Sequence, residues 1–165
     1  MKEIKLTKGM VALVDDADYE RISCQKWHVR KDRNTYYAIR QVRCNGRKHT
    51  VLMHREILNT PVGLLTDHAD RNGLNNQRSN IRICNIAENN RNVKIRKDST
   101  SGYKGVSFHK RDEKWRAYIG FDNKIMWLGY FKTAKIAALA YDNAACELFG
   151  EFASLNFDMG EIAFG

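Results

Sequence analysis

Apolar residues in the first half of the chain come in short runs separated by polar and turn-forming residues. Residues 10–14 predict a strand, and the acidic segment 16–18 can cap a short helix that ends near Cys24. Segments 26–30 and 36–42 are rich in aromatic and β-branched residues, which is typical of strands. The other elements predicted for this half are a strand over 48–53 after a hairpin turn at Asn45 and Gly46, a short helix over 54–58, strands over 64–68 and 79–84, and a helix from about residue 85 to residue 95.

The second half has a simpler pattern. Segments 101–108, 114–120 and 125–131 predict three strands joined by polar turns. Thr133 then opens an alanine-rich stretch that predicts a helix over 133–145, whose small side chains allow close packing on the sheet.

The pattern as a whole predicts an α+β protein. We expect two domains, residues 1–95 and residues 96–165, because the element pattern and the charge both change between them. The basic segment 94–100 is either a short linker or only a solvated run of charge.

The chain is strongly basic, with 28 Lys and Arg against 19 Asp and Glu, a formal net charge of +9 and a pI near 9.5. Such a charge favours a polyanionic partner or an anionic membrane surface. No apolar run is long enough to span a membrane, and no signal peptide, lipidation signal or basic amphipathic helix is evident. We therefore expect a cytoplasmic protein without membrane association. Residues 94–124 carry a net charge of +5 and residues 125–165 a net charge of −3, which suits a basic sheet backed by an acidic helix.

The four cysteines do not predict a metal site. Cys24, Cys44, Cys84 and Cys146 include no Cys-x-x-Cys pair, so a zinc site built on cysteine is not expected. Free and mostly buried thiols in a reducing compartment account for them.

One polar segment carries the candidate chemistry. Asp67 and His68 end a short apolar stretch, and a turn at Asn72 and Gly73 follows. Asn80 comes twelve residues after the histidine, and Asn89 nine residues later. Metal-dependent phosphodiester hydrolysis needs oxygen ligands for a divalent cation and an imidazole that takes a proton from water. Each residue taken singly is better explained as a turn or surface residue, and only the combination favours catalysis.

This set resembles the HNH endonucleases, most closely the phage and homing branch, in which asparagine replaces the last histidine. The resemblance implies a ββα-metal fold, with two short strands and a helix around one divalent ion. His68 is then the general base, and its unperturbed pKa of about 6.5 suits proton transfer at neutral pH. Asp67 and Asn89 offer oxygen and are the expected ligands of Mg²⁺ or Mn²⁺, one ion per active site. Asn80 is expected to tie the loop together and to orient the histidine.

Further charged residues near this segment are candidates for DNA contact. His54 and Arg55 form a pair that often precedes the nuclease unit in the same family, where either phosphate contact or a structural role would explain it. Arg71, Arg78 and Arg82 flank the segment as candidate phosphate clamps, with solvent-facing charge as the alternative.

The phrases YKGV, WLGYF, TAKIAALAYDNAA and LNF occur in that order within residues 99–157. Together they resemble the plant ethylene-response-factor (Apetala-two) DNA-binding domain, in which a three-stranded sheet lies in the major groove of double-stranded DNA and a helix supports its back. Trp115 matches a core position of that family and Trp127 a position that touches DNA. Most of the guanine-reading arginines of the plant domains are missing here, so their target sequence cannot be carried over. The residues expected to contact DNA in this half are Lys104, Ser107, His109, Lys110, Arg111, Arg116, Tyr118, Lys124 and Trp127.

The sequence thus predicts a monomeric, two-domain DNA endonuclease of the homing or phage type, which nicks one strand at a time. The alternative is a non-catalytic DNA-binding regulator that keeps a degenerate nuclease fold. A protein that binds or cuts RNA would draw on the same charge and is the weaker third reading.

Overall fold

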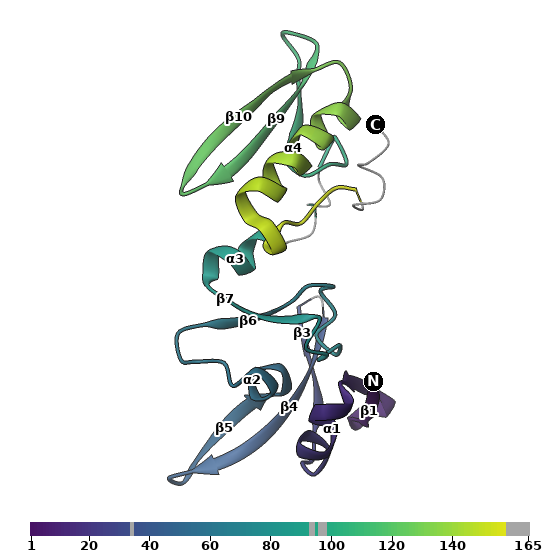
Figure 1. Cartoon of the computed structure of the whole chain (residues 1–165), viewed down its shortest axis with the longest axis vertical. Coiled ribbons are helices and arrows are strands. Elements are labelled where there is room, and N and C mark those ends of the chain that lie inside the picture. The colour runs from purple at the N-terminus through teal and green to yellow at the C-terminus, as the bar shows by residue number, and fades with distance from the viewer. Residues whose placement is uncertain (34, 93–94, 96–98, 158–165) are drawn as a thin grey trace. The chain divides into compact units, whose positions relative to one another are not determined.

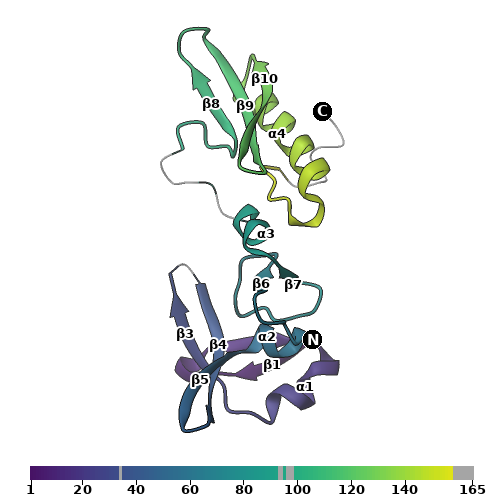
Figure 2. The same ribbon diagram turned by 90° about the vertical axis from the view of Figure 1, so that its left-hand side faces the viewer.

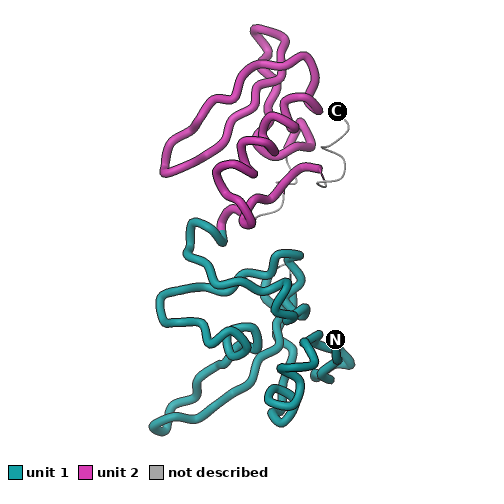
Figure 3. Tube along the Cα trace, in the orientation of Figure 1, with its two compact units in different colours: residues 1–89 teal, residues 90–165 magenta. Residues whose placement is uncertain are grey.

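The computed structural model describes residues 1–33, 35–92, 95 and 99–157. The chain divides into two compact units, Met1–Asn89 and Asn90–Gly165 (Figure 3). The predicted basic segment 94–100 lies largely outside the described residues, and the predicted domain boundary after residue 95 falls within it. Among the described helices, none combines the length and the apolar content needed to cross a membrane.

Unit 1 opens with two antiparallel strands, β1 (Lys2–Lys5) and β2 (Val11–Val14), with the short 3-10 turn η1 (Thr7–Gly9) between them. The sequence did not predict β1, because Ile4 is the only buried side chain in it. Helix α1 (Asp16–Ser23) follows as predicted. Its cap differs from the prediction: Asp15 stands at the N-cap, and its carboxylate accepts hydrogen bonds from Arg78 and Gln77 instead of capping the helix.

A second antiparallel sheet has the strand order β3 (His28–Asp32), β4 (Thr35–Cys44), β5 (Arg47–Leu52). Asn45 and Gly46 both have positive φ, 50° and 73°, which confirms the predicted tight hairpin turn. The distal ends of β4 and β5 project from the rest of unit 1 as a two-stranded ribbon (Figure 1). The buried core of the unit lies at the other end, where helix α2 (Met53–Leu58) brings Met53 and Ile57 against Trp27 and Ala38.

The segment with the candidate chemistry forms strands β6 (Leu65–His68) and β7 (Ile81–Cys84), followed by helix α3 (Ile86–Arg91). The two strands pair antiparallel, with Asp67 opposite Arg82 and His68 opposite Ile81. Helix α3 ends at Arg91, earlier than the predicted residue 95. At its start, Asn85 and Glu88 each accept a hydrogen bond from the other's backbone N–H, at 2.9 and 2.8 Å, which is a reciprocal capping box.

Unit 2 contains a sheet with the order β10 (Lys124–Phe131), β9 (Lys114–Phe121), β8 (Val106–His109) and the long helix α4 (Ala134–Phe149). Figure 2 shows α4 along one face of this sheet, where Ala137 and Ala138 pack against Val106 and Ala117. The hydroxyl of Thr133 accepts the N–H of Ile136 at 3.2 Å, so the predicted start of the helix is confirmed. The helix runs to Phe149, four residues beyond the prediction.

Strand β8 starts at Val106, later than the predicted residue 101. Gly102 and Gly105 have φ values of 70° and 71°, which a strand cannot contain, and the Ser101 hydroxyl donates to the Val106 carbonyl at 2.8 Å. The preceding segment is therefore a turn. The structure confirms a mixed protein with antiparallel sheets and a C-terminal sheet packed on one helix.

Candidate functional site

Strand β6 places Asp67 and His68 at its end, and both side chains are buried, with 8% and 4% of their surface exposed. Arg82, directly opposite Asp67 on β7, donates from Nε at 3.0 Å and from Nη2 at 2.7 Å to the same carboxylate oxygen, Oδ2. This charge-assisted pair fixes the carboxylate in place. Arg82, predicted as a phosphate clamp, is thus engaged within the protein.

The His68 imidazole lies among polar and aromatic neighbours that come from three separate segments. Its Nε2 lies 3.3 Å from Oδ1 of Asn76. Its ring meets the His54 ring edge-on, with centroids 4.8 Å apart, and the Tyr37 ring at 5.8 Å. Burial lowers the pKa of His68, and the Asn76 hydrogen bond and the nearby Asp70 and Asp67 carboxylates oppose that shift. A buried, neutral imidazole is able to accept a proton at neutral pH.

His54 belongs to the same cluster, although its sequence pattern left phosphate contact and a structural role equally open. The side chain is 4% exposed, and its Nδ1 is buried without a partner among the described residues. Burial, together with the charges of His68 and Arg55, lowers the pKa of His54 to about 3. His54 is therefore uncharged at physiological pH. Burial also raises the pKa of Tyr37, whose ring contacts both histidines.

Asn80 holds together the loop between the two strands. Its Oδ1 accepts the backbone N–H of Asp70 at 3.0 Å, and its Nδ2 donates to Asp70 Oδ1 at 2.9 Å and to the Asn75 carbonyl at 2.8 Å. Asp70 also accepts from the backbone of Asn72 and from the Asn75 amide, both at 2.8 Å. These contacts are of the loop-tying kind expected of Asn80, whereas the hydrogen bond to His68 comes from Asn76. The sequence analysis did not identify Asp70 and Asn76 as site residues. The high number of asparagines between the two strands could have indicated a hydrogen-bonded loop.

Asn89, the second expected metal ligand, lies half-buried on α3. No group of three or more His, Cys, Asp or Glu side chains that could hold a metal ion occurs in the described part of the chain. The ligands expected for a metal at this site remain a carboxylate oxygen of Asp67 and the amide oxygen of Asn89. This donor set fits Mg²⁺ or Mn²⁺, which commonly take one or two protein oxygens and complete their shell with water and phosphate.

Two other arginines predicted to contact phosphate, Arg55 and Arg78, instead donate hydrogen bonds to acceptors within unit 1. Arg78 donates from Nε and Nη2 to the buried Asp18 carboxylate at 2.7 and 2.9 Å, and this contact lowers the pKa of Asp18. Arg55 donates to the carbonyls of Leu64 at 2.7 Å and Pro61 at 3.1 Å. Both side chains thus connect separate segments of the chain. Arg71 is exposed in the loop, with a φ of 63°.

The projecting ribbon of β4 and β5 is a basic surface that the sequence analysis did not single out. Arg43, Arg47, Lys48 and His49 are all exposed around its tip, which contains no acidic residue. A two-stranded ribbon fits the major groove of duplex DNA. The sequence feature that could have predicted this surface is the run of basic residues on both sides of the turn at Asn45.

The face of the unit 2 sheet that lies away from α4 carries four of the nine residues predicted to contact DNA in that unit, Ser107, Arg116, Tyr118 and Trp127. Arg116 donates to the Ser107 hydroxyl at 2.7 Å and lies over the ring of Trp127 at 5.6 Å. Tyr118 is opposite Trp127 in the register, with ring centroids 5.8 Å apart, and Trp127 is 62% exposed. Trp115 packs against the core cluster beneath α4, as expected.

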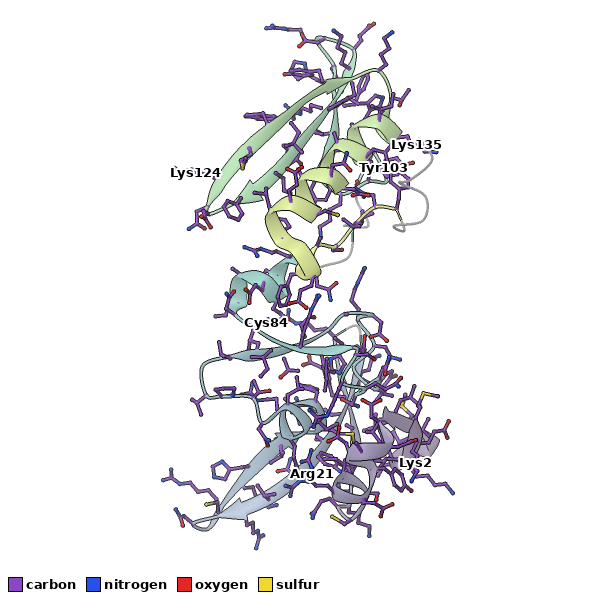
Figure 4. The ribbon with its side chains drawn as sticks, in the orientation of Figure 1. Lys2, Arg21, Cys84, Tyr103, Lys124 and Lys135 are labelled. Carbon is purple, nitrogen blue, oxygen red and sulfur yellow. The ribbon has the colours of Figure 1, made fainter. Side chains whose placement is uncertain are left out.

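The remaining predicted contacts of unit 2 lie in different places. His109 lies 3.2 Å from the Asp112 carboxylate and beside the Tyr130 ring. Lys110, Arg111 and Lys124 are exposed on the turns, with Lys124 at the end of the β9–β10 hairpin (Figure 4). Lys104 donates to the backbone carbonyl of Arg91 at 2.6 Å.

Comparisons with known proteins found one matching domain family and several relatives. The model of the AP2 domain matches residues 101–151. Protein 3.8 of Escherichia phage T7 is 36% identical over 93 residues, which cover 56% of this chain and 76% of that protein. An uncharacterized HNH endonuclease of Acanthamoeba polyphaga mimivirus is 29% identical over 150 residues, covering 90% of this chain and 76% of that protein. An AP2-like ethylene-responsive transcription factor of Arabidopsis thaliana is 40% identical over 65 residues, which are 13% of its own length.

The matches relate this protein to an HNH endonuclease and place an AP2 domain at residues 101–151. The chain belongs to the family of phage T7 protein 3.8.

Proposed function

We propose that this protein is a metal-dependent DNA endonuclease, in which unit 1 cuts and unit 2 anchors the chain on duplex DNA. The observation that carries the proposal is the pair Asp67 and His68, a fixed carboxylate beside a buried histidine whose pKa is lowered by burial. The order of the elements β6, β7 and α3, with Asn89 on α3, is the one expected of a ββα-metal fold and supports the proposal. The relationship to an HNH endonuclease over 90% of the chain supports the same reading.

In the proposed reaction, His68 accepts a proton from the water molecule that attacks the scissile phosphate. Asp67 and Asn89 would hold Mg²⁺ or Mn²⁺, which when bound supplies Lewis-acid stabilisation of the phosphate charge and the leaving 3′ oxygen. Arg82 orients the Asp67 carboxylate through its two hydrogen bonds. Asn80 keeps the intervening loop closed.

DNA binding by unit 2 is supported by the AP2 domain match and by the polar and aromatic face of its sheet. The planar guanidinium of Arg116 is held in place by Ser107 and Trp127, which suits it for contact with a base edge or a phosphate. The basic ribbon of unit 1 adds positive charge to the proposed catalytic unit. The net charge of +9 favours association with a polyanion.

The alternative function, a non-catalytic DNA-binding regulator, is favoured by one observation. The Asp67 carboxylate already receives two hydrogen bonds from Arg82, so it does not require a cation to satisfy its charge. A protein that no longer cleaved DNA but kept its fold would show the same pair.

Cleavage of supercoiled plasmid in Mg²⁺ or Mn²⁺ decides between the two. We expect wild-type protein to cut and chelator to stop the reaction. His68→Ala should lower the cleavage rate by about 10²–10⁴-fold, the usual scale for loss of a general base, with DNA affinity unchanged. His28→Ala, at an exposed position on β3, is the matched control and should cut normally. If the wild-type protein bound DNA but did not cleave it, the result would support the alternative function, a non-catalytic DNA-binding regulator.

A further inference from the structure

The projecting ribbon of β4 and β5 is two-stranded over its outer part (Figure 1). Strand β3 pairs with β4 only as far as Ile39, whereas β4 and β5 continue to pair from Arg40 and Val51 to Cys44 and Arg47. Over this length no further strand of the described part of the chain covers either edge of the ribbon. A two-stranded antiparallel ribbon is narrow enough to enter the major groove of duplex DNA, which is about 12 Å wide.

The register assigns the side chains of the ribbon to its two faces. Successive residues of a strand point to opposite faces, so Gln41 and Arg43 share one face with their cross-strand partners Thr50 and Lys48. All of these side chains are polar and exposed, and we call the set the polar face of the ribbon. It has a cationic pair toward the tip and a neutral pair toward the base.

The neutral pair holds an amide in a defined orientation. Nε2 of Gln41 donates to the hydroxyl of Thr50 at 2.9 Å, across the two strands. The second N–H of the amide and its oxygen have no other hydrogen-bond partner among the described residues. A donor and an acceptor side by side on one amide match the N7 acceptor and the N6 amino group of adenine, which glutamine reads in the major groove. The methyl group of a threonine suits contact with the methyl group of thymine.

Positive charge surrounds this neutral pair. The chain contains no Asp or Glu from Arg33 to Arg55, and Arg43, Arg47 and Lys48 are exposed around the tip of the ribbon. Such a surface is complementary to the phosphates that border a DNA groove. Exposed charge on a ribbon also discourages pairing with the edge of another sheet. That role requires neither the neutral pair nor the hydrogen bond that orients its amide.

We propose that the polar face of the ribbon enters the major groove of duplex DNA, where Gln41 contacts adenine and Thr50 contacts the methyl group of the paired thymine. Arg43 and Lys48 contact phosphates beside the groove. The proposal rests on the proposed binding of duplex DNA and adds a specificity-determining contact from unit 1. The major groove of duplex RNA is too narrow for side chains to read, so RNA of the same sequence should not be selected in this way.

Selection from duplexes of randomised sequence measures the preference in the full-length protein, with chelator present so that binding is observed without metal-dependent cleavage. We expect the wild type to select an A·T pair at one position, with a preference of about 5- to 150-fold over the other base pairs. Gln41→Ala should lose the selection at that position alone. Gln25→Ala, which removes an exposed glutamine outside the ribbon, is the matched control and should keep it.

An altered base tests the contact atom by atom. 7-Deazaadenine lacks the N7 acceptor but still pairs with thymine, so its use at the selected position should weaken binding by the wild type and by Gln25→Ala. Binding by Gln41→Ala should not change, because that protein no longer contacts N7. Thr50→Val keeps a methyl group and removes the hydroxyl that orients the amide. It should reduce the selection, but by less than Gln41→Ala does.

The cationic pair provides the contrast. Arg43→Ala with Lys48→Ala should weaken binding to all duplexes alike and lower the slope of log K against log salt by about two, with the A·T selection retained. Undiminished selection in both Gln41→Ala and Thr50→Val would overturn the proposal, as would a wild type that selects no A·T pair or selects equally well in duplex RNA.

This experiment separates the proposal from the nuclease function. If the wild type cuts plasmid in Mg²⁺ but Gln41→Ala keeps the full selection and the sensitivity to 7-deazaadenine, the nuclease function stands and the contact by Gln41 is refuted. If the selection depends on Gln41 in a protein that cuts no DNA, the contact is confirmed and the nuclease function is refuted.

Discussion

At the scale of single residues, burial is what makes the histidines of unit 1 different from one another. His54 and His68 are each 4% exposed, whereas His28 and His49 are exposed on strands. An imidazole removed from water loses the hydration of its charged form, so its pKa falls. Burial therefore keeps the imidazoles of His54 and His68 neutral at physiological pH, and a neutral imidazole can accept a proton.

This difference predicts how stability depends on pH. The unfolded chain binds a proton on His54 at the ordinary pKa of 6.5, whereas the folded chain does so only at about 3. Above pH 6.5, His54 is neutral in both states and does not oppose folding. As the pH falls from 6.5 toward 3, the unfolded state binds more protons than the folded state, so the folded protein loses stability. We expect the unfolding free energy to fall by up to ~1.4 kcal/mol per pH unit in that window from this residue.

Urea unfolding at a series of pH values measures this slope. His54→Phe keeps a ring against His68 and Tyr37 and should flatten the dependence, and His28→Phe should leave it as in the wild type. An identical slope in His54→Phe would assign the acid lability to other groups.

At the scale of secondary structure elements, local patterns predicted most strands and helices, and tertiary contacts determined what the patterns missed. The hairpin at Asn45 and the start of α4 at Thr133 depend on local chemistry and were predictable. The pair Asp67 and His68 was found by spacing alone. The residues around His68 come from β4, α2 and the loop before β7, and no local pattern shows that Tyr37, His54 and Asn76 meet there.

The arginines illustrate the same limit of local information. Arg55, Arg78 and Arg82 were predicted from their charge and position to contact phosphate, but each has acceptors within unit 1. An arginine beside an active site has the same sequence signature whether its partner is a phosphate or a distant carboxylate. Only the fold shows that Asp18 reaches Arg78, 60 residues away.

The ribbon formed by β4 and β5 leads to a prediction at this scale. Arg47→Ala combined with Lys48→Ala should weaken DNA binding and lower the salt dependence of log K by about one for each phosphate that the ribbon no longer neutralises. The matched control is Lys5→Ala with Lys8→Ala, exposed residues of the same charge near β1. Binding isotherms at several salt concentrations measure both. An equal effect of the two pairs would indicate nonspecific charge and not a binding surface.

At the scale of the whole molecule, each unit has its own buried core, so the two proposed activities should be separable. Removal of the segment 99–157 should weaken DNA binding and flatten its salt dependence, with residual metal-dependent cleavage at high protein concentration. In the full-length protein, Arg116→Ala with Trp127→Ala should reproduce the decrease in affinity without removing the unit. Unchanged affinity and salt slope in both proteins would refute the anchoring role of unit 2.

The number of proposed catalytic sites predicts the order of products. The proposed ligands Asp67 and Asn89 and the proposed base His68 form a single catalytic set, and one set can hydrolyse one phosphodiester at a time. A monomer should therefore nick one strand, and linear DNA should require a second protomer or a second event. We expect open-circular plasmid to accumulate before linear plasmid, and chelator to stop both steps.

Asp67→Ala should abolish cleavage with DNA binding retained, whereas Asp32→Ala, at an exposed position on β3, should cut normally. Linear product formed first, at a rate that does not depend on protein concentration, would contradict single-strand nicking, and cleavage that persists in excess chelator would exclude the metal-dependent reaction.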